Sequence, residues 1–159
     1  MAGKVYAIPV GYEGATPYLI IHDAVRALEF YGKAFGATEI MRIPTPDGKI
    51  GHAEIKIGAA IVMLADEFPD MNCKSPHSLG GSPVSIMVYV QDVDAFVKRA
   101  VAAGAKVITP VEDKFYGDRS GSLEDPFGHH WHFATHVEDV PPDEMAKRAV
   151  AFMKQQGGA

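Results

Sequence analysis

The sequence contains a single cysteine, Cys73, among its 159 residues. One thiol cannot form a disulfide within the chain, and proteins without disulfides are typical of reducing compartments. We therefore expect a cytoplasmic location and interpret Cys73 as an inert loop thiol rather than a nucleophile.

Basic residues and long apolar runs are also scarce. Lysine and arginine number 15 against 20 aspartates and glutamates, which gives a formal net charge of −5. Nucleic-acid binding needs a concentrated Lys/Arg face, and no such cluster occurs in the sequence. No apolar stretch approaches the length of a membrane span, and residues 1–14 show no signal or transit peptide. We expect neither a nucleic-acid nor a membrane partner.

What the sequence does contain is an internal repeat at an offset of about 69 residues. Each copy has a strand-like run, an amphipathic helical pattern and a Gly-Ala step, followed by further strand-like runs. The first three features occupy residues 17–21, 25–35 and 36–37 in one copy, and 84–90, 93–103 and 104–105 in the other. Both copies therefore predict the order β-α-β-β-β.

The predicted helices carry recognisable boundary residues. Asp23 stands where the first helix needs an N-cap, and Asp92 or Asp94 stands at the equivalent place in the second copy. Gly36 and Gly104 follow the last helical residues, where a left-handed backbone is usual. These residues fix the expected ends of both helices.

The length suits two half-domains that share a core rather than two independent folds. A Pro-, Ser- and Gly-rich stretch separates the copies and is interpreted as a linker. After the second copy, Pro141 and Pro142 open a helix with an apolar stripe, expected to pack on the outer surface or on a partner subunit. The predicted organisation is an N-terminal segment 1–15, a first module 16–65, a linker 66–83, a second module 84–136 and a helical tail 137–159.

Two motifs accompany the repeat, Gly-His-Ala-Glu-Ile-Lys-Ile-Gly at 51–58 and Asp-Pro-Phe-Gly-His-His-Trp-His at 125–132. With the doubled β-α-β-β-β unit, they make the chain resemble the vicinal oxygen chelate superfamily of glyoxalases, bleomycin resistance proteins and extradiol dioxygenases, and most of all its PhnB-like branch. The resemblance covers roughly residues 16–136. It implies an α+β fold in which two tandem βαβββ modules form a cup-shaped mixed sheet, with a C-terminal helix added here, and it implies a homodimer with intrachain or swapped module pairing.

Strand alternation predicts which side chains face the cup. In the last strand, Trp131 and Phe133 are expected to face the helices, which turns His130 and His132 toward the cup. The same rule gives most of the candidate ligand-binding residues. The loop 114–121 could aim two more, Tyr116 and Arg119, at the mouth of the cup. The candidate residues are Tyr18, His52, Glu54, Met63, Ser85, Met87, Tyr89, Tyr116, Arg119, His130 and His132. For Arg119, a structural role in which Asp118 and Arg119 hold the hairpin is an equal alternative.

In metal-dependent members of the superfamily, four strand positions hold the ion, and the resemblance places them on Thr16, Met63, Ser85 and His132. Only His132 is a suitable ligand, because thioether and hydroxyl groups do not replace carboxylate and imidazole on a divalent ion. We expect no metal or other cofactor. A substitute site formed by His52, Glu54 and His132, or by His130 with His132, is the alternative.

Two functions compete on this basis. The first is a metal-free cup that binds a small, partly aromatic molecule through aromatic and thioether walls. The second is a lyase or isomerase of the glyoxalase kind, in which Glu54 or His132 moves a proton, with or without a divalent metal. Burial beside Met63 and Met87 is expected to raise the pKa of Glu54 toward that of a general base, unless His52 or Lys56 cancels the effect.

Overall fold

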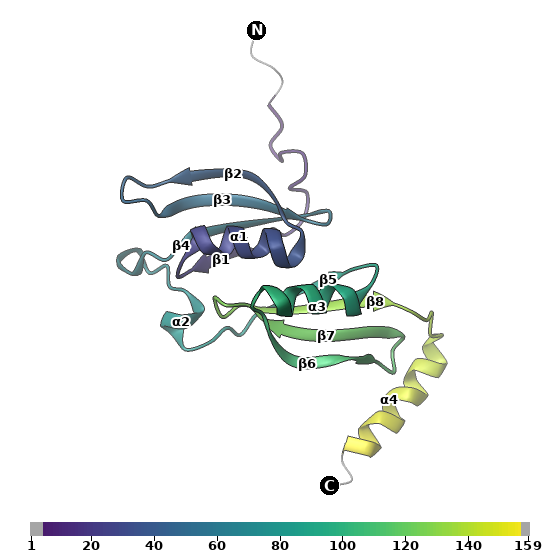
Figure 1. Ribbon diagram of the computed structural model, residues 1–159. Helices are drawn as coiled ribbons and strands as arrows, with labels where there is room; N and C mark the ends of the chain where they lie inside the picture. The colour runs from purple at the N-terminus through teal and green to yellow at the C-terminus, as the bar shows by residue number, and fades with distance from the viewer. Residues whose placement is uncertain (1–4, 157–159) are drawn as a thin grey trace. The chain divides into compact units, whose positions relative to one another are not determined.

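The computed structural model describes residues 5–156, which divide into two compact units between Gly81 and Ser82. Each unit contains one four-stranded mixed sheet and the helix that its first strand leads into (Figure 1). The α+β class and the two tandem βαβββ modules are therefore confirmed, as is the C-terminal helix.

The first unit has the strand order β1-β4-β3-β2, with β1 parallel to β4 and the other neighbours antiparallel. A 3-10 turn and a short helix follow within the stretch interpreted as a linker. The elements are β1 (Tyr18–Ile21), α1 (Ala24–Phe35), β2 (Thr38–Pro44), β3 (Ile50–Ile57), β4 (Ala60–Asp66), η1 (Pro69–Met71) and α2 (Pro76–Leu79).

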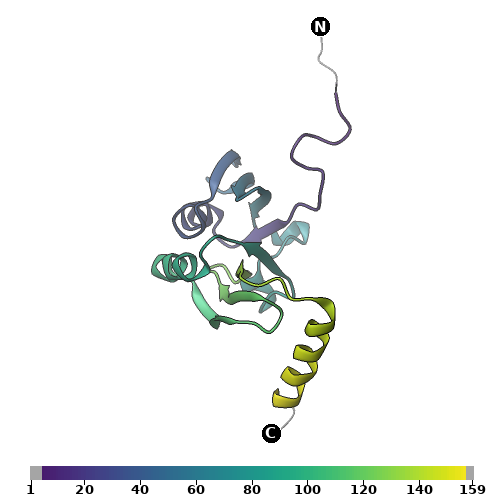
Figure 2. The same cartoon turned by 90° about the vertical axis from the view of Figure 1, so that its right-hand side faces the viewer.

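The second unit repeats this order as β5-β8-β7-β6, again with its first strand parallel to its last. Its sheet is followed by a helix that extends beyond the end of β8 (Figure 2). The elements are β5 (Ser85–Tyr89), α3 (Val93–Ala103), β6 (Lys106–Asp113), β7 (Asp118–Glu124), β8 (His130–His136) and α4 (Pro142–Gln156).

Side-chain and backbone caps end the two core helices where the sequence predicts. The Asp23 carboxylate accepts from the backbone of Arg26 at 3.1 Å, and Gly36 ends α1 with φ 67°. In the second unit, Asp92 rather than Asp94 is the N-cap, accepting from the backbone of Ala95 at 3.0 Å. Asp94 lies in the first turn of α3, which leaves its carboxylate available to a neighbouring strand.

Each of the helices α1 and α3 covers one face of the sheet in its own unit. The core of each unit lies between that helix and that sheet. In the second unit, Trp131 and Phe133 are fully buried with parallel rings 6.2 Å apart, and Phe96 of α3 lies 4.5 Å from Phe133. In the first unit, Ala53, Ile55 and Ile57 are almost fully buried. The predicted alternation of β3 and β8 is thus confirmed on their helix faces.

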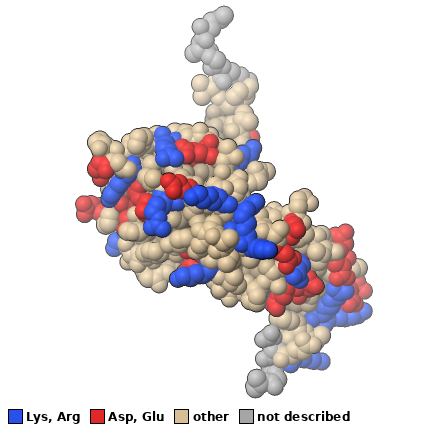
Figure 3. All heavy atoms as spheres, viewed as in Figure 1, with Lys and Arg blue, Asp and Glu red and all other residues tan. Residues whose placement is uncertain are grey.

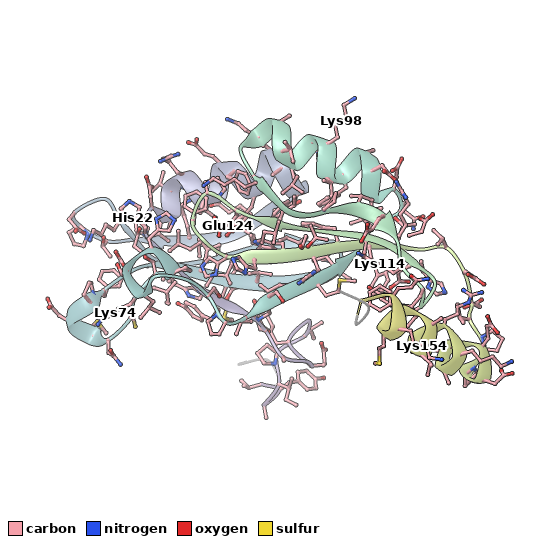
Figure 4. All side chains as sticks on the ribbon, turned by 90° about the horizontal axis from the view of Figure 1, so that it is seen from below. His22, Lys74, Lys98, Lys114, Glu124 and Lys154 are labelled. Atoms are coloured by element: carbon pink, nitrogen blue, oxygen red, sulfur yellow. The ribbon has the colours of Figure 1, made fainter. Side chains whose placement is uncertain are left out.

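The C-terminal helix α4 contacts the β6–β7 turn of its own unit. The ring of Phe152 lies 5.1 Å from that of Phe115, and Arg148 donates to the carboxylate of Glu138 at 2.8 Å. In Figure 4 the label Lys114 shows the position of the β6–β7 turn, and the label Lys154 shows the last part of α4. In the part of the chain that the structure describes, no helix is long and apolar enough to cross a membrane.

Candidate functional site

The candidate residues of the first unit lie on the sheet face opposite α1, which we call the inner face. Strand register places Tyr18 beside Met63, Met63 beside Glu54, and Glu54 beside Met41. Four strands therefore contribute one continuous row of an aromatic ring, two thioethers and a carboxylate. Of these, Met41 on the edge strand β2 was not among the predicted residues.

A hydrogen-bonded chain of four side chains crosses this inner face. The hydroxyl of Tyr12 donates to Oε2 of Glu54, and Nε2 of His52 lies 3.1 Å from Oε1 of the same carboxylate. The other ring nitrogen of His52, Nδ1, lies 2.8 Å from the hydroxyl of Tyr18. The structure thus brings together three predicted residues and adds Tyr12, which comes from the segment before β1.

These contacts decide the direction in which the pKa of Glu54 is shifted. Its residue is only 7% exposed, and burial by itself raises the pKa of a carboxyl. The hydrogen bond from Tyr12, and then that from His52, outweigh burial and lower the pKa of Glu54 below its usual value. The rise expected from burial is thus cancelled, as the sequence foresaw for a contact with His52, and the unforeseen hydrogen bond from Tyr12 is the larger cause, because both donors stabilise the ionised form.

A pocket of about 330 Å³ opens on the inner face of the first unit, next to Tyr18. Its floor comes from β1, β3 and β4, and its wall comes from the loop that follows β4. Lys74, labelled in Figure 4, belongs to this loop. The residues that line the pocket are Tyr18, Ile20, Gly51, Ala65, Asp66, Phe68, Met71 and Cys73.

The pocket wall is fixed by local hydrogen bonds. Phe68 and Cys73 form an antiparallel bridge across η1, and the Glu67 carboxylate accepts from the backbone of Ser75 at 2.9 Å and the hydroxyl of Ser78 at 2.7 Å. Sequence reasoning missed this wall because the stretch has the composition of a linker. The apolar side chains of Phe68 and Met71 within that stretch were the available signal.

In the second unit, the face opposite α3 carries the remaining candidates from β5 and β8. Register sets Ser85 beside His130 and Met87 beside His132. His130 lies 3.2 Å from the carboxylate of Glu124, which is labelled in Figure 4 at the end of β7. These residues form a mixed row of histidines, a hydroxyl, a carboxylate and the Met87 thioether on one sheet.

A second hydrogen-bonded group lies at the other end of that face. Tyr89 donates to Asp118 at 2.6 Å, and the same carboxylate lies 2.8 Å from Nδ1 of His136. Asp139 contacts the other ring nitrogen at 2.9 Å. Hydrogen bonds to the two carboxylates raise the pKa of His136, and the bond to Asp118 has the larger effect. The hydroxyl of Tyr89 is thus bound to a carboxylate of the same unit.

The structure places Arg119 away from the predicted site. Its guanidinium donates to Asp94 on α3 at 2.7 Å and to Asp113 on β6 at 3.0 Å. It therefore belongs to the helix face of β7 and holds the β6–β7 hairpin, which agrees with the structural alternative for Arg119, although the acidic partners are Asp94 and Asp113 rather than Asp118. The physical reason is Asp94, which α3 does not use as its cap. Tyr116 lies in the preceding turn, where its ring contacts Phe115.

Two of the four positions that the resemblance assigns to a metal ion carry poor donors. Met63 and Ser85 lie on the inner faces of their sheets and offer a thioether and a hydroxyl, which are poor ligands for a divalent ion. Within either described unit, no three His, Cys, Asp or Glu side chains form a group that could hold a metal ion. His132 remains the single ligand-type residue of the four.

The chain matches one family model over most of its length and has relatives of similar length. Residues 15–133 match the model of the Glyoxalase/Bleomycin resistance protein/Dioxygenase superfamily. An uncharacterized protein of Mycobacterium bovis, Mb0911c, is 47% identical over 145 residues, which cover 89% of this chain and 93% of that protein.

Solved structures agree with the fold. TioX from Micromonospora sp. ML1 is 29% identical, with a TM-score of 0.62 over 81% of this chain and 100% of that chain. A fosfomycin resistance protein of Listeria monocytogenes, solved with Mn(II) and a dihydroxypropylphosphonic acid, is 17% identical, with a TM-score of 0.59 over 76% of this chain and 90% of that chain. The chain therefore belongs to the glyoxalase/bleomycin resistance protein/dioxygenase superfamily.

Proposed function

We propose that this protein binds a small, partly aromatic molecule without a metal ion. The observation that carries the proposal is the pocket beside Tyr18, where Phe68, Met71 and Ile20 offer aromatic, thioether and aliphatic surface. Small-molecule sites combine such apolar walls with a few polar groups that fix orientation. Among the lining residues, Tyr18 carries a hydroxyl group, and that hydroxyl lies 2.8 Å from Nδ1 of His52.

Charge favours a neutral ligand. Asp66 lines the pocket, but its two carboxylate oxygens accept from the backbone of Ala24 at 3.0 Å and of Ile50 at 2.7 Å. No lysine or arginine lines the pocket. Figure 3 shows the first unit from the side of α1, and on that side acidic and basic side chains are interspersed.

The proposal is tested with N-phenyl-1-naphthylamine, a neutral probe whose fluorescence rises in apolar sites. We expect saturable binding that EDTA does not affect and that protects Cys73, the chain's single thiol, from a thiol reagent. Met71 is 74% exposed, so Met71→Lys introduces a charge at the pocket with little effect on the core. This variant should weaken binding.

The matched control is Met153→Lys on α4, where Met153 is 69% exposed and lies in the other unit. It should bind the probe as the wild type does. Equal binding by the wild type and Met71→Lys, with no protection of Cys73, contradicts the proposed site.

A proton-transfer enzyme is the second candidate, and the hydroxyl–imidazole–carboxylate chain of Tyr18, His52 and Glu54 favours it. The lowered pKa of Glu54 makes that carboxylate a weak base, which is why binding is preferred. If a lyase or isomerase turnover is found, Glu54→Gln should reduce it by about two to four orders of magnitude. For a binding protein there is no such turnover to lose.

We further infer a cytoplasmic homodimer of the PhnB-like branch. The lone cysteine supports the location. The edge strands β2 and β6 support the dimer, since each exposes apolar side chains such as Ile40 and Ile108. Exposed apolar edge strands are natural templates for pairing with another chain.

A further inference from the structure

We propose that Tyr18 presents its hydroxyl oxygen to the pocket as a hydrogen-bond acceptor, so that the site selects a flat ring carrying an N–H or O–H donor. This inference rests on the proposed function and names the ligand class of the same pocket. His52 and Glu54 act as positioning residues, because they set the direction of the Tyr18 hydroxyl.

The anchoring begins at Glu54. Its two carboxylate oxygens are held separately, Oε2 by the hydroxyl of Tyr12 and Oε1 by Nε2 of His52 at 3.1 Å. With the carboxylate fixed on both sides, the imidazole of His52 has one preferred orientation. Its Nδ1 then faces β1 and lies 2.8 Å from the Tyr18 hydroxyl.

The direction of the hydrogen bonds follows from what each group can do. An ionised carboxylate only accepts, so Nε2 of His52 must carry the hydrogen that faces Glu54. In the neutral imidazole the other nitrogen, Nδ1, is then an acceptor, and the Tyr18 hydroxyl donates to it. The hydrogen of Tyr18 is used inside the protein, and its oxygen lone pairs remain for a ligand donor.

The other pocket side chains offer no competing acceptor. Phe68, Met71 and Ile20 are apolar or only weakly accepting, and both oxygens of Asp66 receive backbone N–H groups. The Cys73 thiol is directed to the carbonyl of Met71 at 3.7 Å. A donor on a ring bound in the pocket therefore finds its partner at Tyr18.

The experiment compares indole with benzofuran, which share a bicyclic shape and differ in the N–H donor. Calorimetry on the full chain near pH 8 should give indole about threefold to tenfold tighter binding, the worth of one hydrogen bond. In Tyr18→Phe the two affinities should become equal. Tyr6→Phe removes a hydroxyl from the N-terminal segment outside the pocket and should keep the wild-type ratio.

His52→Ala tests the positioning role, because it removes the nitrogen that receives the Tyr18 hydrogen. The ratio of indole to benzofuran affinity should fall toward that of Tyr18→Phe, while the affinity for benzofuran stays at the wild-type value. A ratio that keeps the wild-type value in His52→Ala would overturn the positioning role.

The outcomes separate this inference from the function on which it rests. Indole and benzofuran binding with equal affinity to the wild type would overturn the acceptor role of Tyr18 and leave the proposed pocket standing. A preference that persists in Tyr18→Phe would overturn it as well. Failure of both compounds to bind would overturn the proposed function together with the inference.

Discussion

Asp125 accepts a hydrogen bond from the indole nitrogen of Trp131 at 2.9 Å, which ties the turn before β8 to the core of the second unit. The other oxygen of Asp125 accepts from the backbone of Phe127 at 2.9 Å and of His129 at 3.0 Å. One buried carboxylate thus shapes the Asp-Pro-Phe-Gly-His turn and orients the largest side chain of the core. The motif that carried the family resemblance has a structural role.

Trp131→Ala should lower the free energy of unfolding by about 3 to 5 kcal/mol, because the fully buried ring leaves a cavity against Phe133. Chemical denaturation monitored by circular dichroism measures this change. Trp131→Phe should lose less, since it keeps most of the packing and removes the hydrogen bond to Asp125. An unfolding midpoint that hardly moves in Trp131→Ala would contradict the burial of this strand face.

Asp125→Ala should destabilise the fold by about 2 kcal/mol, because the buried donors of Phe127 and Trp131 and the partly buried donor of His129 lose this acceptor. Asp125→Asn keeps the shape and one carbonyl acceptor and should lie between the alanine variant and the wild type. The same denaturation measurement ranks the three proteins, and equal stabilities would show that the turn does not depend on this carboxylate.

The Tyr12–Glu54 hydrogen bond makes stability depend on pH. The pKa of Glu54 is lower in the folded chain than its usual value of about 4.3, so its contribution is present above that value and is lost as the pH falls through the folded-state pKa. Tyr12→Phe removes the largest cause of the lowered pKa. We expect this variant to be less stable than the wild type near pH 7 and equally stable once Glu54 is protonated in both.

Denaturation curves collected from neutral to acid pH test this dependence, with Tyr6→Phe as the control. A constant difference between Tyr12→Phe and the wild type at every pH would show that Tyr12 acts through packing and not through the carboxylate.

The unsuitable donor set predicts that divalent metals do not bind. The purified protein should contain less than stoichiometric metal, and added Mn²⁺, Ni²⁺ or Zn²⁺ should not shift the unfolding midpoint of the wild type or of His132→Ala. Elemental analysis and thermal unfolding measure the two quantities. A bound ion that disappears in His132→Ala would refute the metal-free assignment.

Light scattering should give a particle of about twice the 17.1 kDa chain mass at micromolar concentration. Ile40→Lys and Ile108→Lys each place a charge on an edge strand, β2 or β6, where the replaced side chain is about half exposed. The variant whose edge strand forms the dimer contact should become monomeric. A wild-type monomer across this concentration range would contradict the dimer.

The sequence by itself determined the architecture. The repeat offset, the Asp N-caps and the Gly residues after each helix are local signals, and local backbone preferences suffice to define these elements. Strand alternation likewise predicted that Trp131 and Phe133 face the helix. The alternation of side chains between the two faces of a strand also places Tyr18, Met63 and Glu54 on the inner face. They form a row because strands with one buried face have a defined register.

Only the tertiary structure decided how the site residues are paired. Tyr12 lies 42 positions from Glu54, and nothing in the sequence indicates that its hydroxyl reaches that carboxylate. Arg119 turned to Asp94 on α3 instead of the inner face. Such contacts depend on distances between side chains of different elements, and these distances in turn set the pKa of Glu54 and place the loop of Phe68, Met71 and Cys73 as a pocket wall.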